Sequence, residues 1–173
     1  LRGNDLMGTE DGMRDTVRQV ILPIWNPWYF LSLYANAANI QGVERTDRVD
    51  LLDRYILAKT RRLVSDVTTS MDAYDLFGAC SSIRSFLDAL TNWYVRRSRD
   101  RFWAGDQAAV DTLHTVLAVL SRTLAPLLPL TTEAVYRGLT GEPSVHLTDW
   151  PAAADLPADD DLTGVRQGDD RGQ

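Results

Sequence analysis

A run of arginines and aromatic side chains is the part of this sequence whose residue types could do chemistry. Between Asn92 and Trp103, four arginines fall within six residues, and aromatic residues flank them on both sides. A guanidinium pairs with phosphate and stacks on bases, and aromatic rings stack on unpaired bases, so this pattern suits RNA. Cations near the C-terminus of a helix also complement the helix dipole without any ligand. The run alone therefore leaves an RNA-binding and a purely structural interpretation open.

Residues for catalysis or metal binding are not grouped in the sequence. The only cysteine, Cys80, and the only histidines, His114 and His146, do not have the spacing of a zinc site. We interpret Cys80 as a small packed apolar residue and His114 as a residue at a helix surface or boundary. Residues 138–141 lack the lysine of a phosphate loop, and Asp159–Asp161 is typical of a solvated tail. We expect no catalytic residues, no metal and no cofactor in this chain.

Length and composition indicate one globular domain. The chain has 173 residues, enough for one real core. No apolar stretch approaches the ~20 residues that a membrane span needs, and no signal-peptide pattern is present at the start of the sequence. A single cysteine allows no internal disulfide, which fits a reducing compartment. We therefore expect a cytoplasmic protein without a membrane partner.

The net charge of −6 is unevenly distributed along the chain. Residues 149–173 hold seven Asp and two Arg, a charge of −5, whereas residues 54–101 hold nine basic and five acidic residues, a charge of +4. Phosphate recognition depends on local charge more than on net charge. The middle of the chain can therefore present a basic surface.

Apolar residues that recur every three or four positions predict helices throughout the chain. The expected helices cover residues 11–38, 49–73, 75–103 and 107–125, with a short helix from Thr131 or Thr132 to Leu139. Short connections between them predict an all-α fold, an antiparallel bundle of four to five helices. We place a helical domain at residues 1–150 and an acidic, disordered tail at residues 151–173.

Several local features should shape these helices. Pro23 and Pro27 each remove a backbone donor, so we expect a kink or break near residues 22–27. Asp75 is a candidate N-cap, and Gly105 and Asp106 should end one helix and cap the next. Residues 144–150 read as a short extended piece.

Helical spacing separates the arginines into two groups. Arg97 and Arg101 continue the apolar stripe that includes Leu90, so we expect them to reach a neighbouring element or another domain. Trp93 and Tyr94 should pack in the core. The second group, Arg96 and Arg99, lies with Asn92 on a polar face that can lie against solvent or an RNA. This face also holds Ser81, Ser85 and Asp88.

Three stretches of this basic region carry a family resemblance. The segments Asp53–Lys59, Tyr74–Phe77 and Leu90–Arg99 resemble the anticodon-binding helical domain of isoleucyl-tRNA synthetase, a class I aminoacyl-tRNA synthetase. The similarity is greatest to its eukaryote-like branch, which some bacteria also have. Three further segments agree with the same family, and the resemblance covers residues 1–151: Val17–Phe30, Leu124–Glu133 and Ser144–Pro151.

This resemblance implies a role in protein biosynthesis. The parent ligase uses ATP and magnesium to load isoleucine onto tRNA, with His-Ile-Gly-His and Lys-Met-Ser-Lys-Ser type signatures that this chain lacks. It thus implies a fragment without the catalytic and editing domains, which neither activates isoleucine nor charges tRNA. The expected partners are the anticodon stem-loop of tRNA-Ile and the rest of the synthetase chain. We expect the fragment to be a monomer.

The resemblance also suggests an anticodon-binding site. Asn26 occupies the position where this class presents a polar side chain to the anticodon, and Trp25 either stacks on a base or supports the kink. Arg96 and Arg99 are the expected phosphate contacts, with Asn92 beside them. Residue 27 is a proline where the family has a small residue.

Two alternatives remain at the level of sequence. Apolar stripes alone are equally compatible with a helical protein-interaction module that binds no RNA. The equivalent domain of valyl- or leucyl-tRNA synthetase is the other alternative, and the run Trp93–Arg99 disfavours it.

Overall fold

The fold is built from helices that form five rods within the described part of the chain. The computed structural model describes residues 10–47 and 50–158. Two of the rods contain a π-helical segment, labelled η1 in the first and η2 in the third. In chain order the elements are α1 (Glu10–Thr16), η1 (Val17–Ile21), α2 (Leu22–Ala38), α3 (Leu51–Asp72), α4 (Leu76–Asp88), η2 (Ala89–Val95), α5 (Arg99–Trp103), α6 (Gln107–Leu124) and α7 (Pro129–Thr140), followed by the 3₁₀ turns η3 (Val145–Leu147) and η4 (Ala153–Asp155). The described residues contain no strand, so the predicted all-α bundle is confirmed.

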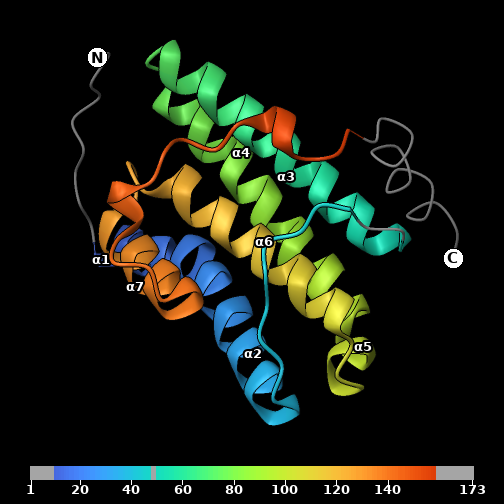
Figure 1. The fold of residues 1–173 in the computed structure, drawn as a ribbon. Helices are drawn as coiled ribbons and strands as arrows, with labels where there is room; N and C mark the ends of the chain where they lie inside the picture. The colour runs from blue at the N-terminus through green and yellow to red at the C-terminus, as the bar shows by residue number, and fades with distance from the viewer. Residues whose placement is uncertain (1–9, 48–49, 159–173) are drawn as a thin grey trace, which may run out of the picture.

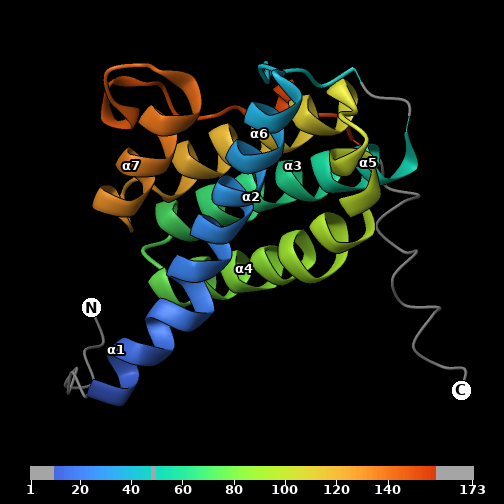
Figure 2. The same cartoon turned by 90° about the horizontal axis from the view of Figure 1, so that it is seen from below.

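Helix α6 runs through the middle of the molecule (Figure 1). Every residue from 109 to 121 is buried, because α2, α3 and α7 all pack against this helix. The apolar stripe predicted from the sequence lies in the core: Leu113, Val116, Leu117, Leu120 and Leu124. Figure 2 shows α2 crossing the pair formed by α3 and α4. The central helix thus joins the α3–α4 pair to the α2 and α7 side of the bundle.

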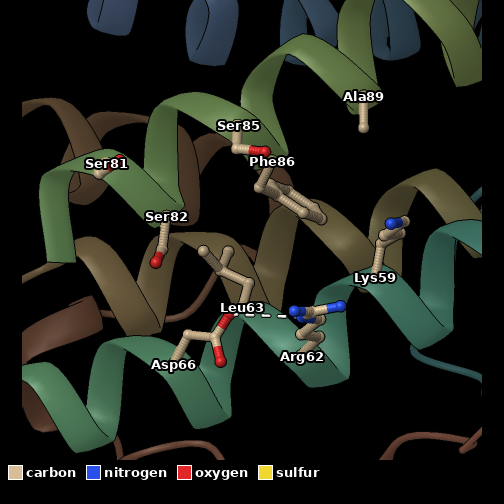
Figure 3. Close-up of a pocket in the computed structure, with 9 residues that line it drawn as sticks. All are labelled: Lys59, Arg62, Leu63, Asp66, Ser81, Ser82, Ser85, Phe86 and Ala89. Carbon is tan, nitrogen blue, oxygen red and sulfur yellow. Dashed lines mark ion pairs between the residues drawn. The ribbon is translucent and has the colours of Figure 1, made fainter. Parts of the chain in front are cut away.

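Helices α3 and α4 form a hairpin and lie side by side along their length (Figure 2). The turn between them is capped by Asp75, whose Oδ1 accepts a hydrogen bond from the Gly78 N–H at 2.9 Å. The cap predicted at Asp75 is therefore confirmed. A groove lies between the two helices (Figure 3).

The first rod continues through both of its prolines without a break. The π segment η1 ends where the Leu22 N–H bonds to the Val17 carbonyl oxygen. Pro23 is the second residue of α2 and directly follows this π segment, and Pro27 lies within the helix. Neither proline has a backbone N–H to donate to the preceding turn. The irregularity is thus a π-turn immediately before Pro23. The expected break at residues 22–27 is absent, and the expected kink there stays a prediction.

The ends of α6 and α7 follow local capping rules. Gly105 has a positive φ of 71°, and the Asp106 side chain accepts a hydrogen bond from the Ala108 N–H, as predicted. The cap predicted at Thr131 or Thr132 is wrong, because α7 begins at Pro129. Thr132 lies inside the helix, and its hydroxyl donates to the Leu128 carbonyl at 2.9 Å.

The chain after α7 packs back onto the bundle. Residues 144–150, predicted to be extended, contain a 3₁₀ turn at Val145–Leu147. Pro151 and Leu156 are buried, and Arg61 donates to the Leu156 carbonyl at 2.7 Å. The first eight residues of the predicted tail therefore lie against the helices. Residues 159–173, including Asp159–Asp161, lie outside the described residues.

Two single-residue interpretations are wrong. Cys80 is exposed on α4 rather than packed. His114 is only 8% exposed, because the connection between α2 and α3 covers this part of α6 and places Gly42 against the imidazole.

None of the helices in the described ranges has the length and apolar character needed to cross a membrane.

Candidate nucleic-acid interface

The aromatic residues of the arginine run anchor it to the bundle. Tyr94 is fully buried, and Trp93 is half-buried against Tyr55, with 4.2 Å between the ring centroids. The predicted core packing of both residues is confirmed. Arg97 lies with its guanidinium 5.1 Å from the centre of the Trp93 ring, a cation–π contact. Arg97 is exposed, and this contact is with a tryptophan of its own rod, so the predicted contact with a neighbouring element is not found for Arg97 among the described residues.

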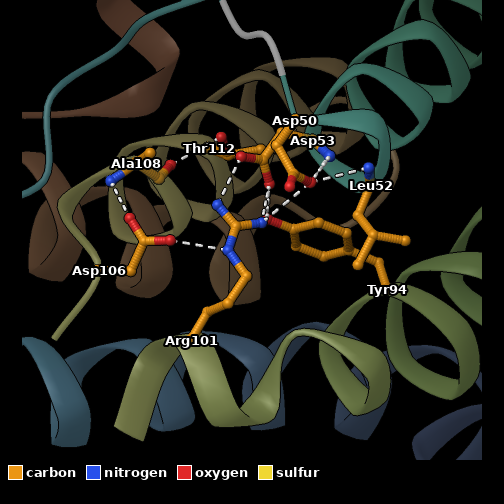
Figure 4. Close-up of polar contacts among 8 residues, drawn as sticks. All are labelled: Asp50, Leu52, Asp53, Tyr94, Arg101, Asp106, Ala108 and Thr112. Atoms are coloured by element: carbon orange, nitrogen blue, oxygen red, sulfur yellow. Dashed lines mark hydrogen bonds and ion pairs between the residues drawn. The ribbon is translucent and has the colours of Figure 1, made fainter. Parts of the chain in front are cut away.

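Arg101 joins the end of the run to two other helices (Figure 4). Its two terminal nitrogens donate to the carboxylate of Asp53 on α3 at 2.9 and 2.8 Å. Its Nε donates to Asp106, the N-cap of α6, at 2.7 Å. A weaker contact of 3.3 Å reaches Asp50, the N-cap of α3. The prediction that Arg101 reaches a neighbouring element is confirmed.

The most buried acceptor in this network is Asp53, which has no exposed surface. The Tyr94 hydroxyl also donates to it, at 2.9 Å. Burial raises the pKa of Tyr94 well above its ordinary value, and the nearby Asp53 carboxylate raises it further. The hydrogen bond to Asp53 raises the pKa of Arg101, so the guanidinium stays charged at any relevant pH. These contacts fix the helix that presents the other arginines.

A groove between α2 and η2 brings two of the predicted site residues together. It has a volume of about 580 Å³, and Asn26 from α2 and Asn92 from η2 both line it. The Asn92 amide donates to the Asp88 carboxylate, one turn earlier, at 2.7 Å. The other residues lining the groove are Arg18, Leu22, Pro23, Pro27, Phe30, Thr91 and Val95. Arg18 was missed from the sequence, because it stands alone as a cation within an apolar pattern.

Arg96 and Arg99 lie outside this groove, on the exposed face of the same rod. They continue a row of exposed residues spaced three or four apart, which we call the α4–α5 ridge: Ser81, Ser85, Asp88, Asn92, Arg96 and Arg99. Asn92 belongs to both the ridge and the groove. The ridge therefore places two arginines next to a groove that contains two amides.

Trp25 is not among the residues that line the groove. It is 38% exposed, and its ring packs edge-to-face on Trp28 with 4.7 Å between the centroids. Pro27 is buried and forms part of the groove wall. The aromatic surface of Trp25 thus lies beside the amide site rather than within it.

This arrangement supplies recognition chemistry. An amide can donate to and accept from the edge of one base, and arginines bind phosphate through charge-assisted hydrogen bonds. Within residues 10–47 and 50–158, no three His, Cys, Asp or Glu side chains are grouped to hold a metal ion. The surface is suited to binding a polyanion that carries exposed bases.

Comparison with known proteins identifies the family. Residues 53–169 match the family model described as the anticodon-binding domain of tRNA ligase. The chain belongs to this family of anticodon-binding domains. The matched region begins at Asp53, the buried acceptor for Arg101, and includes the whole α4–α5 ridge.

Relatives extend the similarity to the first rod as well. The isoleucine–tRNA ligase of Leifsonia xyli subsp. xyli is 58% identical over 171 residues, which is 95% of this chain and 15% of that protein. The isoleucine–tRNA ligase of Mycobacterium tuberculosis is 60% identical over 165 residues, 95% of this chain and 16% of the relative. That of Bifidobacterium longum is 52% identical over 163 residues, 90% of this chain and 15% of the relative. The chain spans about 15% of the length of these relatives.

Proposed function

We propose that this domain recognises the anticodon stem-loop of tRNA-Ile as part of an isoleucine–tRNA ligase. Membership of the anticodon-binding family supports binding of tRNA, and relatives that are isoleucine–tRNA ligases support the isoleucine identity over valine or leucine. The observation that carries the proposal is the groove in which Asn26 and Asn92 meet, beside the arginines of the ridge.

The two kinds of side chain divide the work of recognition. Arg96 and Arg99 are exposed and hold backbone phosphates, which positions the RNA without reading its sequence. Asn26 and Asn92 read the edges of unpaired bases that enter the groove. Trp25 is 38% exposed, and its indole ring stacks on a base in this proposal. Identity is therefore read between α2 and η2, and affinity comes from the ridge.

The catalytic steps belong to the rest of the ligase in this proposal. Activation of isoleucine with ATP and magnesium, and its transfer to tRNA, take place outside the present chain. The domain itself acts as a cytoplasmic, monomeric module that contributes tRNA selection. Because only part of the tRNA-binding surface is present, we expect weak binding that depends steeply on salt.

Titration of the purified chain with three RNAs tests this function: tRNA-Ile, tRNA-Ile with a swapped anticodon, and an unrelated tRNA. We expect tRNA-Ile to bind most tightly and the anticodon swap to remove that preference, with affinity falling as salt rises. Equal affinity for all three RNAs would disprove anticodon reading. Absence of salt-dependent binding would instead favour a protein-interaction module, which has no phosphate contribution to its affinity.

A further inference from the structure

A second groove, separate from the one that contains Asn26, lies on the other side of α4. It occupies the space between α3 and α4 and has a volume of about 330 Å³. Figure 3 shows Lys59, Arg62 and Asp66 on α3 and the serines on α4, with Arg62 directed along α3 toward Asp66. Its polar lining consists of Lys59, Arg62, Asp66, Ser81, Ser82 and Ser85, and its apolar lining of Leu63, Phe86 and Ala89.

The polar side chains of this groove are mostly hydrogen-bond donors. Lys59 and Arg62 are three residues apart on α3 and both line the groove. The Lys59 ammonium also lies 5.4 Å from the centre of the Tyr55 ring, a cation–π contact. Three serines of α4 line the other side, and the Ser82 hydroxyl points toward α3 (Figure 3). Nucleic-acid phosphates accept hydrogen bonds from these groups, Ser included. The donor set therefore matches a phosphate oxygen better than a neutral polar ligand.

Among the residues that the structure describes, Asp66 is the one acid that lines this groove, and it leaves donors of Arg62 available. The contact joins Arg62 Nε to Asp66 Oδ2 at 3.6 Å, and both side chains are exposed. Exposed pairs of this kind contribute little to stability, so they are readily shared or exchanged. A guanidinium has five N–H donors, and the contact with Asp66 uses the one at Nε. The terminal nitrogens can bind an anion while Asp66 stays in place.

The position of the groove relates it to the ridge. Ser81 and Ser85 line the groove and also belong to the α4–α5 ridge with Arg96 and Arg99. Asn92, on the same ridge, lines the groove on the α2 side. One exposed rod is thus flanked by an amide groove on one side and a basic, hydroxyl-lined groove on the other. Residues 54–101, which contain this groove, carry a net charge of +4.

We propose that the α3–α4 groove binds a backbone phosphate of the tRNA whose anticodon occupies the α2–η2 groove. This inference rests on the proposed function and adds a second phosphate site, formed by Lys59, Arg62 and the serines of α4. An RNA backbone carries regularly spaced phosphates, so an RNA lying across the ridge can place one of them in the groove while its bases reach the amides. The contact adds affinity that is independent of tRNA sequence.

A charge-removing variant tests the site: Lys59→Gln with Arg62→Gln. The matched control is Arg14→Gln with Arg137→Gln, which removes the same charge from exposed positions on α1 and α7. We expect the groove variant to weaken all tRNAs alike and to reduce the log–log salt slope by roughly 0.7–0.9. The ratio of affinities at 50 and 200 mM salt then falls about threefold relative to the unchanged chain. The control should leave that ratio nearly unaltered.

The outcomes separate the two proposals. If the groove variant keeps the full salt slope while Arg96→Ala with Arg99→Ala reduces it, the groove binds no phosphate, and anticodon recognition stands without it. If the unchanged chain itself shows no salt-dependent binding of tRNA, the proposed function fails and this inference fails with it. Circular dichroism of each variant shows whether the helices are retained.

Photocrosslinking gives a second measurement that does not depend on charge. Ser82→Cys in a Cys80→Ala background places a single thiol in the groove for a thiol-reactive photocrosslinker, because Cys80 is exposed and would otherwise also react. The matched control is Ala134→Cys on the exposed side of α7. Crosslinks to tRNA from position 82 and not from position 134 support the site. Equal crosslinking from both positions, or none from position 82, overturns it.

Discussion

Arg101 forms a two-point ion pair with Asp53, a carboxylate 48 residues away with no exposed surface. The pair connects the end of the arginine run to the first turn of α3, and Asp106 adds the start of α6 to the same guanidinium. Burial of a carboxylate is costly unless it is paired and hydrogen-bonded, and here Arg101 and Tyr94 supply those bonds. The network therefore fixes the orientation of the ridge.

Removal of Arg101 should strongly destabilise the fold. Arg101→Met leaves Asp53 buried without its cation, and we expect the free energy of unfolding to fall by about 3–5 kcal/mol. Denaturant unfolding followed by circular dichroism measures this decrease. Arg97→Met is the control, because Arg97 is exposed and contacts only a ring face in the described network; its effect should stay under ~1 kcal/mol. A decrease at Arg101 as small as that at Arg97 would contradict the structural role of the pair.

The helical rods can be predicted well from the sequence, because each helix is determined by residues that are close together in the chain. Apolar spacing gives α3 and α6 within two residues of their observed ends, and Asp75 and Asp106 cap helices by contacts within three residues. The predicted position of Arg101 on the core side of its helix follows from the same periodicity. Each of these features depends on residues that are close in the chain.

Features that depend on distant residues could not be predicted in this way. Asp53 was not identified as the partner of Arg101, although an acid within the apolar stripe of a helix signals a buried acceptor that needs a donor. His114 was assigned to a surface because its helix gives no sign that the α2–α3 connection covers it. The groove that unites Asn26 and Asn92 also arises only when α2 crosses η2.

The stability of the domain should depend on the protonation of His114. Burial lowers the pKa of this imidazole, although Glu44 and other neighbours act in the opposite direction. Between the lowered folded pKa and the ordinary value of about 6.5, the unfolded chain binds more protons. Stability is therefore fully present above about pH 6.5 and falls as the pH drops toward the folded pKa.

Comparison of unfolding free energies at pH 7.5 and pH 5 measures this dependence. His114→Leu removes the titrating group, so its decrease in stability on acidification should be smaller than that of the unchanged chain. An identical pH dependence in the unchanged chain and in His114→Leu would disprove the effect.

Arg96 and Arg99 should control affinity without affecting discrimination. Replacing both with alanine removes two phosphate-binding side chains from the ridge, and the removal of each one reduces the salt slope by roughly 0.7–0.9. We expect weaker binding of every tRNA by a similar factor, measured by titration at several salt concentrations. Both side chains are exposed, so the unfolding free energy should change by less than ~0.5 kcal/mol. A salt slope equal to that of the unchanged chain would remove the ridge from the RNA interface.

Asn26 should control discrimination without affecting the salt dependence. Its amide lies in the groove rather than on the arginine ridge, so Asn26→Ala removes a base-edge contact and no charge. Such a contact is worth about 1–3 kcal/mol of discrimination. The affinity gap between tRNA-Ile and its anticodon-swapped form should narrow by about 5- to 150-fold, or close if the gap is smaller. Asn36→Ala, an exposed amide later on α2 and outside the groove, is the matched control and should keep the gap. If Asn26→Ala also keeps the gap, anticodon reading does not take place at this position.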